Sequence, residues 1–378
     1  NSFRVMDFND VIGQQDAKNR LSQMIEEQRI PHALMLCGPK GCGKMAMAMA
    51  LSATLLRQGH ENSANTEAML KTWEHPDLHF TYPVIKPTGT SSDHKMTSDD
   101  FSREWHDMIV KSSYFSIEHW LEEMKAENQQ AIIFEAESDL ITHNLSLKSS
   151  QGGWKICLIW LPERMNITCA NKILKILEEP PQQTVFIMVC EEPEKLLDTI
   201  RSRVQRIDLK RIADSDIEEA LVNRRLIDAD TAKRIARIAN GSWLKALEQM
   251  EANSENTEML EWFKSLMRLA YMRNVKGMKA WSETIAATGR EKQLRAITYF
   301  SRMIRENFMY NFQLPQLNYM SQEEEAFSKN FAKFVNEANV IEISELFQKA
   351  RRDIAQNGNA KIIFFDVALQ MIVLLIRK

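Results

Sequence analysis

The sequence lacks an excess of basic residues, a long apolar run and a leader segment. Lys and Arg number 48 against 51 Asp and Glu, a formal net charge of −3, so there is no global positive field for tight autonomous binding to nucleic acid. The most apolar stretch, 362–376, contains Asp366 and Gln370 and is too short to span a bilayer. No charged and then apolar leader opens the chain. We therefore expect a cytoplasmic protein without membrane contacts, whose contacts with DNA are local or shared with partners.

Paired cysteines and a metal-ligand pattern are also missing. None of the five cysteines forms a CxxC pair, which favours buried thiols in a reducing compartment: Cys37, Cys42, Cys157, Cys169 and Cys190. His75 and His79 have a spacing that would place two metal ligands on one helical face, but Pro76 interrupts such a helix and no third ligand is evident. The sequence predicts no metal site.

What is present is an ordinary globular composition, 44% hydrophobic and 26% charged, in 378 residues, more than one core usually supports. Apolar runs read as strands and periodic segments as helices: strands at 33–37, 156–161 and 184–190, and helices at 44–56 and 167–177. This alternation predicts an α/β fold with a parallel sheet covered on both faces. Residues 57–150 are less regular.

From residue 213 onward nearly everything has helical period, with breaks at Asn240-Gly241 and around Leu314-Pro315. We therefore predict three domains: α/β residues 1–210, a small helical domain at 211–252 and a separate all-α domain at 253–378. Four scattered tryptophans, Trp73, Trp105, Trp120 and Trp154, are interpreted as buried anchors. The acidic run 323–325 is interpreted as a solvated helix start near Ser321.

A phosphate-binding loop is the most informative motif. Gly38, Gly41, Gly43 and Lys44 lie in a GxxxxGK pattern between the strand and the helix, where backbone N–H groups and a helix N-terminus bind phosphates. The next residue should be Ser or Thr, to help hold Mg²⁺, and is Met45, whose thioether is a poor ligand for a hard cation. The loop is either retained as fold architecture or binds ATP or ADP weakly.

The second catalytic element is degraded as well. An active NTPase presents an acidic pair after the strand that ends near 159, where this chain has Trp160 and Leu161, and Glu163 comes too late. Phosphoryl transfer depends on positioned charge and metal ions. We expect no hydrolysis and no required cofactor.

Family resemblance rests on four segments. Residues 171–181, NKILKILEEPP, resemble the NxLLKxLEEPP signature of the AAA+ clamp-loader subunits of bacterial DNA polymerase III, and 199–204, TIRSRV, resemble their TxxSRC motif. VIGQ at 11–14 and RIPHA at 29–33 resemble the segments before their P-loop. The resemblance spans roughly 8–56 and 155–250, and implies an AAA+ P-loop domain, a helical lid and a helical collar that holds subunits in a ring.

Within this family the chain is similar to the delta prime subunits. Gamma/tau keeps the Ser/Thr, the acidic pair and a lid arginine, whereas the lid motif 241–247 here has Leu244 at the arginine's place. Family members commonly carry a four-cysteine zinc module, but no cysteine occurs between 43 and 156, so no zinc is expected. Val204 replaces the motif's cysteine and leaves Arg203 intact.

Arg203 is the candidate catalytic residue. The resemblance implies that it acts as an arginine finger in trans on an adjacent gamma/tau subunit, a role that suits a permanently charged guanidinium. Judged by residue chemistry alone, a surface ion pair or a helix cap is favoured over a finger, because Arg201 and Arg206 lie beside Arg203 in a basic cluster.

The resemblance therefore implies a non-hydrolysing subunit that scaffolds a clamp-loader ring. Its partners would be gamma/tau and delta, with the sliding clamp and primed DNA reached through the complex. The apolar helix beginning near 360 fits subunit packing in a collar, or a core within its own domain. Two alternatives remain: an active gamma/tau-like ATPase, and a P-loop DNA-binding or recombination protein.

Overall fold

The computed structural model describes residues 5–58, 63–150, 152–312 and 320–377. Its contacts divide the chain into two compact units, Asn1–Gln249 and Met250–Lys378. We describe each unit separately. The three-domain division stays a prediction.

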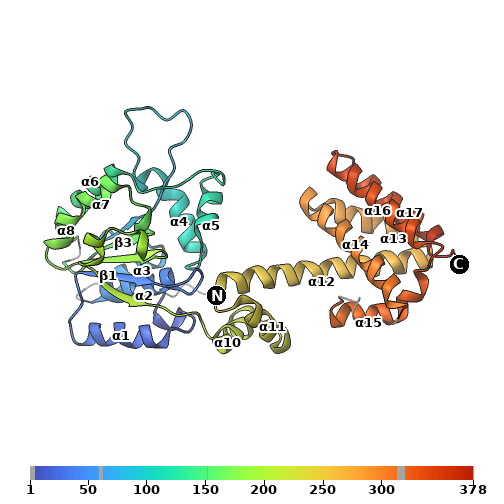
Figure 1. The fold of residues 1–378 in the computed structure, drawn as a ribbon, viewed down its shortest axis with the longest axis horizontal. Helices are drawn as coiled ribbons and strands as arrows, with labels where there is room; N and C mark the ends of the chain where they lie inside the picture. The colour runs from blue at the N-terminus through green and yellow to red at the C-terminus, as the bar shows by residue number, and fades with distance from the viewer. Residues whose placement is uncertain (1–4, 59–62, 151, 313–319, 378) are drawn as a thin grey trace. The chain divides into compact units, whose positions relative to one another are not determined.

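The first unit is built on a five-stranded parallel sheet (Figure 1). The strand order is β2-β3-β4-β1-β5, and the strands are β1 Ala33–Cys37, β2 Leu78–Thr81, β3 Lys155–Trp160, β4 Thr184–Cys190 and β5 Gln205–Asp208. Every residue of β1, β3 and β4 is buried, as expected for central parallel strands covered on both faces. Cys37 and Cys190 lie opposite each other at the ends of β1 and β4, so the segments that follow them meet at one edge of the sheet.

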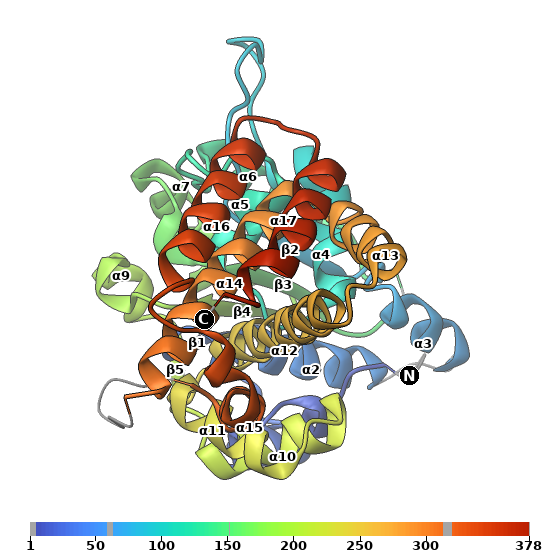
Figure 2. The same ribbon diagram turned by 90° about the vertical axis from the view of Figure 1, so that its right-hand side faces the viewer.

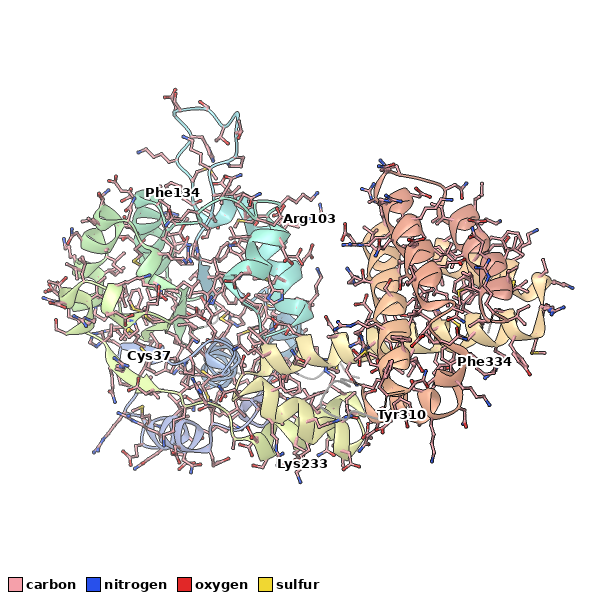
Figure 3. The ribbon with its side chains drawn as sticks, turned by 45° about the vertical axis from the view of Figure 1, so that its right-hand side comes forward. Cys37, Arg103, Phe134, Lys233, Tyr310 and Phe334 are labelled. Carbon is pink, nitrogen blue, oxygen red and sulfur yellow. The ribbon has the colours of Figure 1, made fainter. Side chains whose placement is uncertain are left out.

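Helices cover both faces of this sheet. One face packs against α6 Glu135–Ser146, α7 Ile167–Lys172, α8 Leu174–Glu178 and α9 Asp198–Arg201. The other face contacts α2 Lys44–Arg57, which in turn touches α1 Gln15–Glu26 and α3 Ser63–Lys71. Figure 3 marks Cys37 in the densely packed interior of this unit. The predicted α/β fold, a P-loop sheet wrapped by helices, is confirmed.

Differences from the sequence prediction are local. Strands 33–37 and 184–190 have the predicted bounds, while the helix predicted at 167–177 is two short helices separated at Ile173. The irregular region 57–150 supplies edge strand β2 and four helices, including α4 Ser102–Lys111 and α5 Ile117–Glu123. Its short strand, LHFT, is too brief and too weakly patterned to stand out in the sequence.

An aromatic cluster ties this region to the sheet. Trp105 stacks on Tyr82 with ring centroids 4.0 Å apart and lies 5.4 Å from both Trp120 and Trp160. The Trp120 indole is fully buried and donates to the carbonyl of Pro83 at 2.6 Å. Trp105 and Trp120 are therefore buried anchors, as predicted. The other two predicted anchors, Trp73 and Trp154, are only half-buried.

We use the name lid for residues 211–249, the helical segment that follows β5 within the first unit. It comprises α10 Asp214–Arg225 and α11 Ala229–Ala239, after which α12 Trp243–Met272 begins. The predicted break at Asn240-Gly241 is present, with Asn240 in the left-handed region at φ 49°. Arg224 donates to the carbonyls of Asp10 and Asn9, which fastens α10 to the N-terminal segment.

The second unit is all helical (Figure 2). Beyond the end of α12 it contains α13 Val275–Ala286, α14 Arg290–Tyr310, α15 Gln322–Phe331, α16 Val340–Ala355 and α17 Ala360–Leu374. One apolar core joins these helices. The break predicted around Leu314-Pro315 lies outside the described residues. Among the helices that the structure describes, none is long and apolar enough to cross a membrane.

A buried carboxylate anchors α15 to α14. Ser321 caps α15 as predicted and forms a capping box with Glu324, whose side chain also accepts hydrogen bonds from Tyr299 Oη at 2.6 Å and from Arg302. Glu324 is 5% exposed, so the predicted fully solvated acidic run is wrong at its middle residue. Burial opposes ionisation of Glu324, but the hydrogen bonds from Arg302, Tyr299 and the Ser321 amide outweigh it and lower its pKa.

We predict that this carboxylate makes the second unit sensitive to acid. Because the folded-state pKa lies below the unfolded value, its contribution is present at neutral pH and is lost as pH falls through the folded pKa. Glu324→Ala should cost about 2 kcal/mol at pH 7, a figure discounted for the partial exposure of Arg302. Hydrogen exchange of the α14 and α15 amides measures the change. Glu323→Gln, at the exposed neighbour, is the control and should leave exchange unaltered; equal effects of both changes would contradict the assignment.

Candidate functional site

The phosphate loop connects β1 to α2 at the edge of the sheet where the strands end. Gly41 and Gly43 have φ angles of +75° and +96°, which only glycine adopts readily. A Cβ on Gly41 would overlap Ser242 of the lid. The carbonyl of Gly41 also accepts a hydrogen bond from the Trp243 amide at 2.9 Å. The lid therefore packs directly on the loop.

The loop lysine has its partners inside the chain. Lys44 is 5% exposed, and its ammonium donates to the carbonyls of Gly38 and Pro39 at 2.8 and 2.7 Å. The carboxylate of Glu191, directly after β4, lies 3.5 Å from the same nitrogen. A buried ammonium is costly unless it is paired and hydrogen-bonded. These contacts supply what a bound phosphate would otherwise offer to Lys44.

A segment from the irregular region covers the loop. Tyr114 lies against Gly43, and its hydroxyl accepts the amide hydrogen of Ile12 at 3.0 Å. Burial raises the pKa of Tyr114 to about 12, so the phenol stays neutral. Its neighbour Phe115 packs on Trp160 at 5.1 Å between ring centroids. We call this segment, residues 112–118, the covering segment.

An ion pair holds the covering segment to the loop. Glu118 accepts from Lys40, the third residue of the GxxxxGK pattern, at 3.0 Å. Burial opposes ionisation of Glu118, yet the Ser116 hydroxyl, the backbone amide and Lys40 lower its pKa to about 2. Both side chains are more than half exposed, so this pair orients the segment more than it stabilises the fold.

Little space remains directly beside Lys44 and Met45 of the loop. The cavity at the loop has a volume of about 20 Å³, room for about one water molecule, whereas ligand pockets usually measure about 300–1,000 Å³. Its lining residues come from the loop, the covering segment, two strands and the lid: Gly41, Gly43, Lys44, Met45, Ser113, Tyr114, Phe115, Trp160, Val189, Glu191 and Leu244.

The positions expected to hold the metal, the water and the lid arginine carry apolar side chains in this cavity. Met45 is 5% exposed, Trp160 3% and Leu244 9%. Glu163 does not replace the missing acidic pair, because its Oε1 accepts the amides of Glu191 and Glu192 at 2.8 and 3.1 Å. The carboxylate therefore caps the turn after β4.

The candidate Arg203 is absent from the lining of this cavity. It follows α9, and its Nε donates to Glu178 Oε1 at 2.7 Å, while Nη1 donates to the carbonyl of Thr199 at 2.7 Å. Its side chain is 34% exposed. In the chain alone Arg203 thus makes a surface ion pair, the alternative that its chemistry allowed. The finger role stays a prediction.

The two neighbouring arginines are paired elsewhere. Arg201 contacts Asp198 within the same helix, and Arg206 contacts Asp208 at 2.7 Å. The basic cluster in the sequence is therefore three separate ion pairs rather than one positive patch.

The histidine pair takes no part in a metal cluster that the structure describes. His75 Nδ1 accepts the Asp77 amide at 3.1 Å, and His79 lies in β2. No group of three His, Cys, Asp or Glu side chains that could hold a metal ion occurs among the described residues. The five cysteines are buried and free.

Sequence reasoning missed the residues that fill the site. Tyr114 and Phe115 lie some seventy residues beyond the loop, in a region without a motif, and nothing local marks them. Glu191 carried a usable signal, because an acidic residue directly after a buried strand faces the same sheet edge as the loop. Gln14 belongs to a matched segment, and its side chain bonds to the carbonyls of Cys42 and Lys210 at 2.9 and 2.6 Å.

Comparison with known proteins relates the chain to subunits of DNA polymerase III. A family described as DNA polymerase III, delta subunit, matches residues 13–213. DNA polymerase III subunit delta prime of Bacillus subtilis is 26% identical over 245 residues, 64% of this chain and 59% of that protein. The delta prime subunit of Pseudomonas aeruginosa is 28% identical over 187 residues, 48% and 44% of the two chains. DNA polymerase III subunit tau of Bacillus subtilis is 26% identical over 259 residues, 66% and 38%.

The matched region thus spans less than two thirds of each of these relatives. The family match, residues 13–213, includes the loop, the covering segment and Arg203, and ends directly before α10. Because the family match covers more than half of the 378 residues, this chain belongs to the DNA polymerase III delta subunit family, with delta prime subunits among its relatives.

Proposed function

We propose that the chain is a non-hydrolysing, delta prime-like subunit of a DNA polymerase III clamp loader. It scaffolds the ring that loads the sliding clamp onto primed DNA. The observation that carries the proposal is the filled phosphate loop, with a cavity of only about 20 Å³ lined by Tyr114, Phe115 and the lid. A subunit whose own site is closed contributes to the ring through its surfaces.

Three features support the absence of hydrolysis. Lys44 is neutralised by backbone carbonyls and Glu191. Met45 supplies no oxygen ligand for Mg²⁺, and Trp160 stands where a metal-binding carboxylate belongs. ATP or ADP would bind only if the covering segment moved, which would break the Tyr114–Ile12 hydrogen bond and the Lys40–Glu118 pair.

Arg203 is the group that we propose to act in catalysis, on the ATP site of an adjacent gamma/tau subunit. A guanidinium that neutralises the transferring phosphoryl group must be charged, firmly held and accessible. Arg203 is one-third exposed just after a short helix, and its partner Glu178 is itself half-exposed, so the pair holds the guanidinium at the surface without burying it.

The scaffold role is supported by the last helix. Each turn of α17 buries side chains in the second unit: Phe364, Val367, Ala368, Met371 and Leu374. A second apolar stripe recurs at three- and four-residue spacing, at Ile362, Phe365, Leu369, Ile372 and, just beyond the helix, Ile376. Phe365, Leu369 and Ile372 are half-buried against the core of the second unit, whereas Ile362 is 65% exposed and Ile376 57%. Exposed apolar side chains at both ends of such a stripe are typical of packing against a further helical body, which favours a collar contact with gamma/tau or delta.

Two other functions fit the observations less well. An active gamma/tau-like ATPase would need an open site and its metal ligands. A P-loop DNA-binding or recombination protein would need a basic surface, and the net charge is −3. Turnover of ATP by the purified chain would favour the first, and salt-dependent binding of the chain alone to DNA the second.

Restoring one catalytic element should not restore the reaction. We predict that Met45→Thr, which returns an oxygen ligand beside Lys44, leaves the purified chain without measurable ATP hydrolysis, because Tyr114 and Phe115 still fill the cavity and Trp160 offers no carboxylate. Phosphate release measures turnover, and calorimetric titration with ATP measures binding. Hydrolysis by either the natural or the substituted chain would refute the non-hydrolysing assignment.

Loss of Arg203 should slow a partner. An arginine finger contributes about 10³–10⁵ in rate at its own site. We predict that Arg203→Ala, reconstituted with gamma/tau, delta and the clamp, abolishes one phase of DNA-stimulated phosphate release, while the other sites continue. The control is Arg201→Ala, two residues away and paired within its own helix. Unchanged release kinetics in Arg203→Ala would remove the finger from the proposal.

Polar substitution of the α17 stripe should prevent assembly. We predict that Ile362→Ser with Ile376→Ser weakens co-purification with gamma/tau and delta, because about 1.5–3 kcal/mol of burial per side chain is lost. Exchange protection of α13 and α16 should persist, since both residues are exposed in the chain alone. Gln370→Ala, exposed on the flank of the same helix, is the control. Full assembly of the double variant would exclude this face from the collar contact.

A further inference from the structure

Glu178 is the closest charged neighbour of the proposed finger. It is the last residue of α8, directly before the Glu179-Pro180-Pro181 turn that ends the helix. Its Oε1 accepts from Arg203 Nε at 2.7 Å and also contacts Nη2. One carboxylate oxygen therefore holds one edge of the guanidinium.

The other side of the guanidinium is held by backbone and hydroxyl groups. Nη1 donates to the carbonyl of Thr199 at 2.7 Å and to Ser202 Oγ at 3.2 Å. Glu178 belongs to the LEEPP segment, 25 residues before Arg203, whereas the two acceptors belong to the segment that contains Arg203 itself. Among the described residues, no further acceptor contacts Nη2 in the structure, so its second N–H is available to a ligand.

We infer that Glu178 is a positioning residue, which orients the Arg203 guanidinium toward the phosphates of the neighbouring subunit. The inference rests on the proposed finger role of Arg203. An arginine side chain has several rotatable bonds, and fixing it costs conformational entropy. Contacts that are made before assembly reduce that cost when the transition state forms.

Hydrogen bonding, not charge, is the part of Glu178 that this role needs. A negative carboxylate beside the guanidinium weakens its field at the phosphate, whereas an acceptor at Nε fixes its plane. Glu178→Gln retains an oxygen acceptor and should keep the finger active. Glu178→Ala removes the acceptor and should slow it.

The test uses the reconstituted loader and the phase of phosphate release that Arg203→Ala abolishes. Glu178→Ala should slow this phase about two- to fivefold, as expected for an exposed pair, with its dependence on ATP concentration unchanged. Glu178→Gln should restore most of the rate. In the Arg203→Ala background, Glu178→Ala should add nothing, because it acts through that side chain.

A matched control lies on the adjacent helix. Asp198 pairs with Arg201 in the same way that Glu178 pairs with Arg203, and Asp198→Asn should leave the phase unchanged. The contact itself is read in the free chain by the Arg203 Nε–Hε resonance, which Glu178→Ala should shift toward that of a free arginine and Asp198→Asn should not.

The outcomes separate the two proposals. If no phase depends on Arg203, the finger is refuted, and the role of Glu178 with it. If the phase exists and Glu178→Ala leaves it unchanged or accelerates it, or if Glu178→Ala slows the remaining phosphate release in the Arg203→Ala background, only the positioning role is overturned.

Discussion

A buried ammonium needs hydrogen-bond acceptors and a compensating negative charge, and for Lys44 the chain itself supplies both. The carbonyls of Gly38 and Pro39 turn toward its nitrogen, and Glu191 approaches from the end of the neighbouring strand. In a P-loop that binds nucleotide the same charge is left for phosphate oxygens. Because the charge of Lys44 is compensated within the chain, the loop needs no bound anion. The aromatic side chains of the covering segment can then pack over the loop.

The closure also explains why a catalytically degraded loop keeps its glycines. Gly41 lies so close to Ser242 that any side chain would collide with the lid, and Gly43 makes room for Tyr114. These glycines now serve packing between the loop, the lid and the covering segment. Packing at this junction requires both glycines whether or not a nucleotide binds, so the GxxxxGK motif by itself indicates the fold rather than nucleotide binding.

More of the fold than of the candidate site could be predicted from the sequence. Central strands such as 33–37 and 184–190 are continuous apolar runs between a turn and a helix, and their burial on both faces makes that pattern unambiguous. Strand β2 was not predicted, because a four-residue edge strand with two half-exposed side chains has no such pattern. Met45, Trp160 and Leu244 were recognised as failures of a motif. Tyr114 and Phe115 were not, because what they fill is defined only once distant segments are brought together.

The same limit applies to Arg203. Its motif suggested a role, but its contact with Glu178 joins two segments that the sequence presents as separate signatures. Because both segments contact the same guanidinium, the structure gives a physical reason for the end of α8 to lie close to the residues after α9. In the P-loop, the charge of Lys44 is paired within the chain. Arg203 is instead held at the surface by a half-exposed carboxylate, a placement that suits the proposed role on another chain.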